Sequence, residues 1–352
     1  MEIVFEETNY PLESLNDLQR SYPEASKLIH FIKSWIHGNS NFEFQTSGST
    51  GIPKTITINK DQIIASVHGT TSFLGLEKNH KALICLDPNF IASLMMAARC
   101  LINDMDLLLK RPSSNPLQLF EEPIDFASFV PIQIYKMIED GSIDQLGEIK
   151  NILIGGAPLT QSAFNRLTEI NTNIFVTYGM TETVSHIALM PVKGNYSEAL
   201  FKVLPGIQIG QDEEGCLHIV GQVTQEQVIQ TNDIVEIYNS DKFRWLGRRD
   251  HVINSGGIKI HPEQLEKSIE TLINSDFIVS WKSDSQLGSE CILITEGKRL
   301  SNDQLNKVEK ALTMEFSKYH IPKQYFEIDT FERTDSGKIK REETRKKALG
   351  LL

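Results

Sequence analysis

The densest run of potential phosphate ligands in this sequence is Thr46-Ser47-Gly48-Ser49-Thr50-Gly51-Ile52-Pro53-Lys54. Its glycines let the backbone approach an anion closely, and its hydroxyl and amide groups donate to phosphate oxygens. Lys54 adds a point charge. The GxxxxGK[ST] spacing of a Walker A loop is absent, which disfavours a P-loop phosphotransferase. A phosphate-binding loop is favoured over the alternative, a solvated Ser/Thr/Gly linker.

Elements that could position this chemistry are predicted mainly between residues 80 and 180. Apolar strand-like runs alternate there with helical patterns, which favours a mostly parallel sheet with covering helices. Strands are expected at 82–86, 105–109, 125–130, 150–154 and 173–177, with helices at 91–101, from Pro131 and at 161–170.

The pattern changes after residue 205, where short β-like segments dominate at 217–220, 234–238 and 243–246. The last hundred residues mix both types again. They contain a turn at 254–257, a helix from Pro262, strands at 277–281 and 291–295, a helix at 302–316 and a basic helix-prone tail at 338–347. We therefore predict an α/β and α+β protein with a large domain at 1–248 and a small α+β domain at 249–352.

Composition excludes several classes of protein. The 352 residues carry 35 Lys+Arg and 46 Asp+Glu, a net charge of −11, which disfavours binding to nucleic acid or anionic lipid. The longest apolar run, 90–102, is interrupted by Arg99, so no membrane insertion is expected. The acidic N-terminus lacks a secretory pattern, and the four scattered cysteines fit a reducing compartment, so a cytoplasmic location is expected. The histidines lack zinc-ligand spacing.

The 46–54 loop resembles the phosphate-binding signature of the adenylate-forming superfamily, which includes acyl- and aryl-CoA ligases, peptide-synthetase adenylation domains and luciferases. By this resemblance its ATP-binding residues are Thr46, Ser47, Gly48, Ser49, Thr50, Gly51 and Lys54. The remaining superfamily signatures follow in order between about residues 44 and 341. The region before them is shorter than is usual in the superfamily.

Thr177-Tyr178-Gly179-Met180-Thr181-Glu182 resembles the superfamily's Tyr-Gly-x-Thr-Glu motif and follows a predicted strand. Open α/β sheets place ligands at such strand ends. Tyr178 could stack on adenine beside Gly179, Thr181 could donate to a phosphate, and Glu182 could hold Mg²⁺. The resemblance makes Thr181 and Glu182 catalytic. The alternative is a plain strand, turn and helix with Thr181 as the N-cap.

Gly155-Gly156-Ala157-Pro158-Leu159 resembles the segment that lines the acyl and adenine pocket. Gly156 and Ala157 would then contact the nucleotide, and Gly155 the substrate. An ordinary strand-to-helix turn is the alternative. Phe90 and Met180 are further substrate candidates, and Phe90 and Ser93 depart from the family pattern.

Thr231-Asn232-Asp233 resembles the superfamily's Thr-Gly-Asp motif, whose aspartate binds both ribose hydroxyls. Asn232 replaces the glycine, and asparagine tolerates positive φ better than most residues. The run 246–253 resembles Gly-Arg-x-Asp, which makes Arg248 a ribose ligand and Asp250 the interdomain hinge. A surface turn and an exposed charged hairpin are the respective alternatives.

The segment 334–341 resembles the superfamily's terminal Ser-Gly-Lys-x-x-Arg signature, after a match to Gly-x-x-Ile-x-Pro-x-Glu at 255–263. Lys338 would be the catalytic lysine of adenylation, carried by a small mobile lid domain. A solvated lysine in a basic tail is the alternative.

Within the superfamily, the tract 177–186, the tract 91–99 and the compact length look most like o-succinylbenzoate–CoA ligases of menaquinone biosynthesis. This resemblance implies an ATP- and Mg²⁺-dependent ligase that joins a small carboxylic acid to coenzyme A through an acyl-adenylate. Another aryl- or acyl-CoA ligase, an enzyme that loads a carrier protein, and a non-enzymatic nucleotide-binding relic remain alternatives. The sequence does not fix the oligomeric state.

Two side chains after the Tyr-Gly-x-Thr-Glu match could recognise the second carboxylate of o-succinylbenzoate. Ser185 and His186 carry hydrogen-bonding groups on the same segment and could reach the acid pocket. The alternative is a packed helical turn that touches no ligand. We place Ser185 at the substrate and leave His186 with the packing interpretation.

Overall fold

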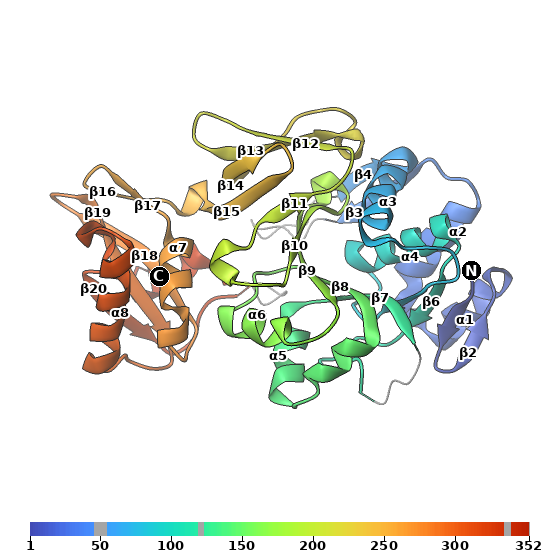
Figure 1. Cartoon of the computed structure of the whole chain (residues 1–352), viewed down its shortest axis with the longest axis horizontal. Coiled ribbons are helices and arrows are strands. Elements are labelled where there is room, and N and C mark those ends of the chain that lie inside the picture. The colour runs from blue at the N-terminus through green and yellow to red at the C-terminus, as the bar shows by residue number, and fades with distance from the viewer. Residues whose placement is uncertain (46–54, 119–122, 334–338, 352) are drawn as a thin grey trace.

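A continuous mixed sheet of thirteen strands forms the larger part of the molecule (Figure 1). The computed structural model describes residues 1–45, 55–118, 123–333 and 339–351. The strand order in this sheet is β12-β13-β14-β15-β11-β10-β9-β8-β7-β5-β6-β1-β2. The predicted parallel sheet and the predicted β-rich segment are therefore one sheet.

The parallel half of this sheet contains the strands expected between residues 80 and 180. Its members are β1 (Ile3–Phe5), β6 (Asp106–Leu109), β5 (Lys81–Ile84), β7 (Ile124–Phe129), β8 (Ile149–Ile154) and β9 (Asn173–Gly179). The antiparallel half consists of β10 (His186–Pro191), β11 (Phe201–Val203), β15 (Lys242–Arg248), β14 (Ile229–Asn239), β13 (Cys216–Gly221) and β12 (Ile207–Gln211). At the other edge, β2 (Thr8–Tyr10) pairs with β1.

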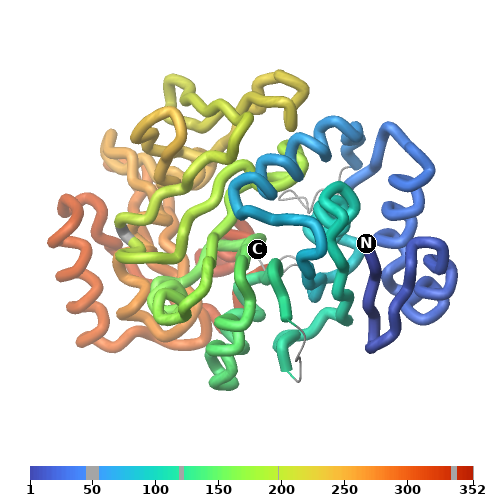
Figure 2. The backbone as a smooth tube through the Cα atoms, turned by 45° about the vertical axis from the view of Figure 1, so that its right-hand side comes forward, coloured from blue at the N-terminus to red at the C-terminus, as the bar shows by residue number. Residues whose placement is uncertain are grey.

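Helices cover both faces of the parallel half, so its strands are buried on both sides. Ala82 and Ile84 enter one core cluster, and the alternating Leu83 and Cys85 enter a second. The first cluster contains α1 (Leu15–Ser21), α2 (Ser26–Ile36), α3 (Lys60–Leu74) and α4 (Ile91–Asn103), and the second contains α5 (Pro131–Glu139) and α6 (Gln161–Thr168). Figure 2 shows the two groups of helices on opposite sides of the strands.

Local signals explain where several of these helices begin and end. Asn59 and Gln62 form a capping box at the start of α3, and Gly75 ends that helix in the left-handed conformation with φ +64°. Pro131 occupies the first turn of α5, as predicted. The Thr160 side chain caps α6 by accepting from the Ala163 amide at 3.2 Å.

A separate five-stranded sheet begins after Arg248. It contains β16 (Ile253–Ser255), β17 (Ile258–Ile260), β18 (Phe277–Asp284), β19 (Gly288–Glu296) and β20 (Gln324–Ile328). Helices α7 (Pro262–Ile269) and α8 (Asn302–Glu315) pack on one core of this sheet, and α9 (Arg341–Ala348) packs on the other. The predicted α/β and α+β fold class is confirmed, whereas the exact domain boundary at 248/249 stays a prediction.

The N-terminal elements are among those that the sequence analysis did not predict, as are the later strands β10, β11, β12, β16, β17 and β20. Besides β1, β2 and the helices α1 to α3, the N-terminal elements include the hairpin of β3 (Asn41–Gln45) and β4 (Thr55–Asn59). None of the helices in the described part of the chain is long and apolar enough to cross a membrane.

Candidate functional site

The carboxyl ends of β5, β7, β8 and β9 meet at one edge of the parallel sheet because these neighbouring strands run in the same direction. The predicted segments that begin at Gly155 and Tyr178 lie at the ends of β8 and β9, and Phe90 follows β5. This edge is where open α/β sheets bind ligands. Phe90 is 61% exposed there.

Several predicted ligands lie outside the described residues: Thr46, Ser47, Gly48, Ser49, Thr50, Gly51, Lys54 and Lys338. The first seven lie between β3 and β4, which pair through Gln45 and Thr55. Lys338 lies between Arg333 and Ile339, which form a β-bridge. The roles assigned to these ligands remain predictions.

Two predicted glycines stand where a larger residue would not fit. A Cβ atom at Gly179 would lie 2.4 Å from both the Cα of His186 and the carbonyl oxygen of Ser185. A Cβ atom at Gly155 would lie 2.4 Å from the Thr177 hydroxyl. Both glycines therefore allow the close approach of strands β8, β9 and β10 at the ligand-binding edge. The next residues, Gly156 and Ala157, are exposed.

The predicted catalytic pair lies on the turn that follows β9. Thr181 and Glu182 belong to the short 3₁₀ segment Thr181–Thr183, and Glu182 is exposed while Thr181 and Met180 are half-buried. Within the described residues, Glu182 forms no ion pair. A solvent-facing carboxylate oxygen is the type of ligand that Mg²⁺ prefers, so Glu182 fits the predicted metal role.

The turn continues into a strained residue. Val184 is fully buried and has φ 67° and ψ −49°, a left-handed conformation that β-branched residues rarely adopt. Strain of this kind persists where the surrounding structure enforces it, and it is frequent at ligand sites. Here the conformation of Val184 redirects the chain, so that the turn ends at Ser185 and β10 begins at His186.

Asp233 is buried, being 9% exposed, and lies within β14 rather than on a surface turn. The Tyr178 hydroxyl donates to its Oδ2 at 2.7 Å, and the Trp245 indole N–H donates to its Oδ1 at 3.0 Å. Burial and the Asp233 charge raise the pKa of Tyr178, so its phenol remains a donor. Asn232 is a strand residue without positive φ, so the tolerance of asparagine for that conformation is not needed at this position.

Two arginines at the junction of the two sheets, Arg248 and Arg249, are already paired. Arg248 binds Asp250 through its Nε at 3.0 Å, and its Nη1 lies 4.0 Å from Asp233. Arg249 binds Glu214 at 2.6 Å and Asn232 at 2.7 Å. Both arginines therefore connect the linker after β15 to the large sheet.

Two further contacts join the C-terminal part to the edge that carries Gly155. Glu270 accepts from the Gln161 amide, the first residue of α6, at 3.0 and 3.1 Å. Lys267 donates to the Tyr196 carbonyl at 3.3 Å and lies 4.0 Å from the centre of the Tyr196 ring. The loop 155–160 is thus followed directly by a residue that contacts the C-terminal part.

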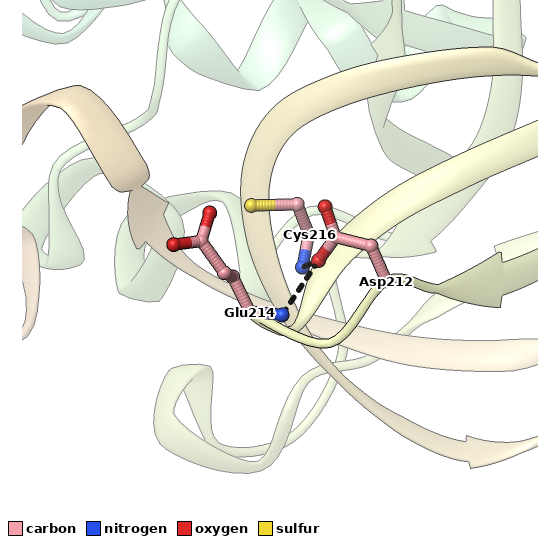
Figure 3. A group of neighbouring side chains, drawn as sticks. All are labelled: Asp212, Glu214 and Cys216. Carbon is pink, nitrogen blue, oxygen red and sulfur yellow. Dashed lines mark hydrogen bonds between the residues drawn. The ribbon is translucent and has the colours of Figure 1, made fainter.

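Asp212, Glu214 and Cys216 bring a possible ligand atom each within 4.8 Å of one another (Figure 3). Asp212 is occupied as the acceptor of the Glu214 and Cys216 amides at 2.9 and 2.8 Å. Glu214 is neutralised by Arg249, and burial raises the pKa of the Cys216 thiol. The group is therefore a structural turn and a poor metal centre.

Arg99 is a candidate that the sequence analysis missed. Its side chain is buried in α4, with 2% exposure, and within the described residues no carboxylate pairs with it. Its Nη2 donates to Thr70 at 3.2 Å and to Ser185 at 3.3 Å, while its buried Nε has no hydrogen-bond partner. Burial lowers the Arg99 pKa to about 10, which still leaves it charged at neutral pH. The available signal was a lone arginine in an apolar helix.

His186 completes this network as a neutral ring. Thr70 donates to the Ser66 carbonyl at 3.1 Å and accepts from Arg99, so the 3.0 Å contact to His186 Nε2 requires that nitrogen to donate. His186 Nδ1 then accepts from Ser185 at 3.3 Å. Burial and Arg99 lower the pKa of His186 well below its usual value. Neither residue lies on a helix, so the expected helical turn was wrong, whereas the predicted contact of Ser185 with the substrate stays a prediction and His186 is buried, as its packing interpretation requires.

Comparison with known proteins shows which family this chain matches. The family described as AMP-binding enzyme matches residues 44–220. A 2-succinylbenzoate–CoA ligase of Staphylococcus epidermidis is 27% identical over 334 residues, covering 86% of this chain and 69% of the relative. The corresponding ligase of Lactococcus lactis is 26% identical over 319 residues, covering 85% and 69%.

Solved structures resemble this fold over most of its length. An acyl-CoA synthetase (AMP-forming)/AMP-acid ligase II-like protein of Dyadobacter fermentans is 35% identical, covers 96% of this chain and 99% of its own, and has a TM-score of 0.64. The o-succinylbenzoate–CoA synthetase of Bacillus subtilis, in complex with ATP and magnesium, is 22% identical with a TM-score of 0.72, covering 86% of this chain and 69% of its own.

Proposed function

Because this chain belongs to the AMP-binding enzyme family, we propose that it is an ATP-dependent carboxylate–CoA ligase whose acid is o-succinylbenzoate. The activity of the Staphylococcus epidermidis and Lactococcus lactis relatives supports this acid and a place in menaquinone biosynthesis. ATP and CoA as co-substrates support a cytoplasmic location.

The observation that carries the substrate proposal is the buried Arg99. A guanidinium group removed from water is strongly unfavourable unless an anion or several acceptors compensate it. Two hydroxyls, those of Thr70 and Ser185, are its hydrogen-bond partners within the described chain. o-Succinylbenzoate has two carboxylates, so one can be activated while the other pairs with Arg99. Ser185 lies three residues after Glu182, the end of the motif segment, and its contact with Arg99 supports placing this cation near the proposed ligand-binding edge.

In the first half-reaction, the substrate carboxylate attacks the α-phosphorus of ATP, forming the acyl-adenylate and releasing diphosphate. Charge develops on phosphate oxygens, so catalysis consists mainly of positioning and electrostatic stabilisation. Lys338 would stabilise that charge, and the 46–54 loop would hold the β- and γ-phosphates. Thr181 would donate to a phosphate, and Glu182 would hold Mg²⁺, which when bound neutralises phosphate charge.

In the second half-reaction, the CoA thiol attacks the activated carbonyl carbon, the carbon–oxygen bond to AMP breaks, and the thioester forms. Asp233 and Arg248 would bind the ribose in both steps. We propose Asp250 as the hinge about which residues 249–352 would turn, so that Lys338 leaves the site and the thiol can enter.

Diphosphate release across a panel of acids, with and without CoA, tests this function. o-Succinylbenzoate should give the highest kcat/KM, with its CoA thioester formed only when CoA is present. Benzoate and medium-chain fatty acids should be poor substrates, since they leave buried donors unpaired, a penalty that can reach about 10⁴-fold. Preference for a monocarboxylic acid would overturn the substrate, and absence of the thioester would overturn the CoA ligase.

A further inference from the structure

The Asp233 carboxylate is held by two donors from different strands before any ligand is considered. Tyr178 on β9 donates to Oδ2 at 2.7 Å, and Trp245 on β15 donates to Oδ1 at 3.0 Å. An ionised carboxylate offers about four lone-pair positions, two on each oxygen. One position per oxygen is thus occupied, and one per oxygen remains for a pair of neighbouring hydroxyls.

A β-bulge brings Trp245 to this position. Asp233 pairs with Arg248 and Ile234 with Gly247, but Val235 pairs with Trp245, so Leu246 is an extra residue on β15. Paired residues of antiparallel strands point to the same face, whereas residues three apart on a regular strand point to opposite faces. The bulge therefore puts both Trp245 and Arg248 on the face of Asp233, and bulges often redirect side chains in this way next to active sites.

The surroundings make the two donors rigid. The Tyr178 ring lies 5.2 Å from Phe243 in an edge contact and 5.7 Å from Phe201, and these two phenylalanines stack at 5.4 Å. The Thr231 hydroxyl accepts from the Asp233 amide at 3.0 Å and fixes the backbone below the carboxylate. Neither oxygen can turn away without breaking a hydrogen bond to a packed aromatic residue.

We propose that Trp245 is a positioning residue for nucleotide binding, which acts with Tyr178 to fix the Asp233 carboxylate so that each oxygen faces one ribose hydroxyl. This role rests on the proposed function because it requires Asp233 to bind ribose. It is distinct from packing, since the relevant group is the indole N–H and not the bulk of the ring.

Direct calorimetric binding of AMP, 2′-deoxy-AMP and 3′-deoxy-AMP tests this role without depending on the identity of the acid. Trp245→Phe removes the N–H and keeps an aromatic ring. It should weaken AMP binding about 3- to 10-fold, less than the full effect of one hydrogen bond to a charged group, because Tyr178 still holds the carboxylate. With the deoxynucleotide that lacks the hydroxyl facing Oδ1, the variant and the wild type should differ less than about twofold.

Matched controls separate positioning from folding. Trp281→Phe and Trp35→Phe make the same chemical change at the other two half-buried tryptophans, which lie under Arg345 and Lys60, and should bind AMP like the wild type. Trp245→His keeps a ring N–H and should recover part of the affinity. If Trp245→Phe does not fold, Tyr178→Phe removes the donor to Oδ2, and its defect should vanish with the other deoxynucleotide.

Equal defects of the Trp245 variant for AMP and both deoxynucleotides would overturn the positioning role. The same loss in either tryptophan control would also overturn it. A wild-type protein that binds AMP no better than the deoxynucleotides would instead refute ribose binding by Asp233, and with it that part of the proposed function.

Discussion

Replacing Arg99 with methionine should have opposite effects on stability and on activity. Methionine keeps a long flexible side chain that suits the apolar surroundings in α4 but removes the charge. In most cores such a change to a buried polar network would destabilise the protein. Here the arginine has no carboxylate partner within the described residues, so removing its charge should stabilise the free enzyme.

The magnitude follows from the burial of the group. The fall of the Arg99 pKa from its usual value to about 10, caused by burial, corresponds to roughly 3 kcal/mol against the charged form. Losing the hydrogen bonds to Thr70 and Ser185 offsets about 1–2 kcal/mol of this. The variant should therefore gain about 1–2 kcal/mol in free energy of unfolding, which for a chain of 352 residues is a rise in Tm of roughly 1–3 °C.

Expressed as free energy, the loss in kcat/KM should be larger than the gain in the free energy of unfolding. Removing one partner of a buried charge pair is worth about 2–5 kcal/mol, so kcat/KM for o-succinylbenzoate should fall roughly 10²–10³-fold. Benzoate, which has no second carboxylate, should lose less than about threefold. Arg99→Lys keeps the charge but not the planar fork and should be intermediate.

Differential scanning calorimetry and the diphosphate-release assay measure the two effects on the same samples. Arg345→Met is the matched control, because Arg345 is also buried but pairs with Glu342 at 2.7 Å and covers Trp281. It should lower Tm and leave the ratio of the two acids unchanged. The reasoning is refuted if Arg99→Met lowers Tm, or if it slows both acids equally.

Three further predictions concern the two half-reactions and the contact between the sheets. Lys338→Ala should slow adenylation about 10²–10³-fold and leave thioester formation from supplied acyl-adenylate largely intact; equal losses would contradict its role. Asp250→Pro fixes φ, so one half-reaction should fall about tenfold or more while the other persists; two wild-type rates would exclude the hinge. Glu270→Ala, which removes the acceptor for the Gln161 amide, should speed proteolysis of the 249–252 linker, whereas Glu270→Gln should not; equal cleavage would argue against this contact.

Much of the fold was predictable because its strongest signals are local. Buried parallel strands are continuous apolar runs, and Pro131 and Gly256-Gly257 mark a helix start and a turn by their own backbone preferences. Among the N-terminal elements, β1 and β2 were not predicted because they are three residues each. Strands that short depend on pairing with β6, a partner about a hundred residues away.

The candidate site likewise contains residues that local sequence could locate and residues that it could not. The motif residues that follow β8 and β9 could be located because a strand and its next turn are contiguous in sequence. The role of Trp245 depends on a single bulge at Leu246, and without it the indole would point to the opposite face. In the sequence, Arg99 only interrupts an apolar helix. Its partners Ser185 and Thr70 are distant in sequence, and only the fold places them beside it.

The proposed nucleotide and acid halves of the site differ in how their buried charges are compensated. Asp233 has a donor on each oxygen and Arg248 nearby, so its geometry is fixed by the protein itself. Arg99 has hydroxyl partners and a buried Nε without one, so an anionic ligand adds the interaction that the protein does not provide. ATP is the co-substrate whichever acid is used, so a nucleotide site needs a carboxylate whose geometry the protein itself fixes. Selection of one acid needs a buried charge that the protein leaves without a counter-ion. Such a charge disfavours the binding of every ligand that cannot neutralise it.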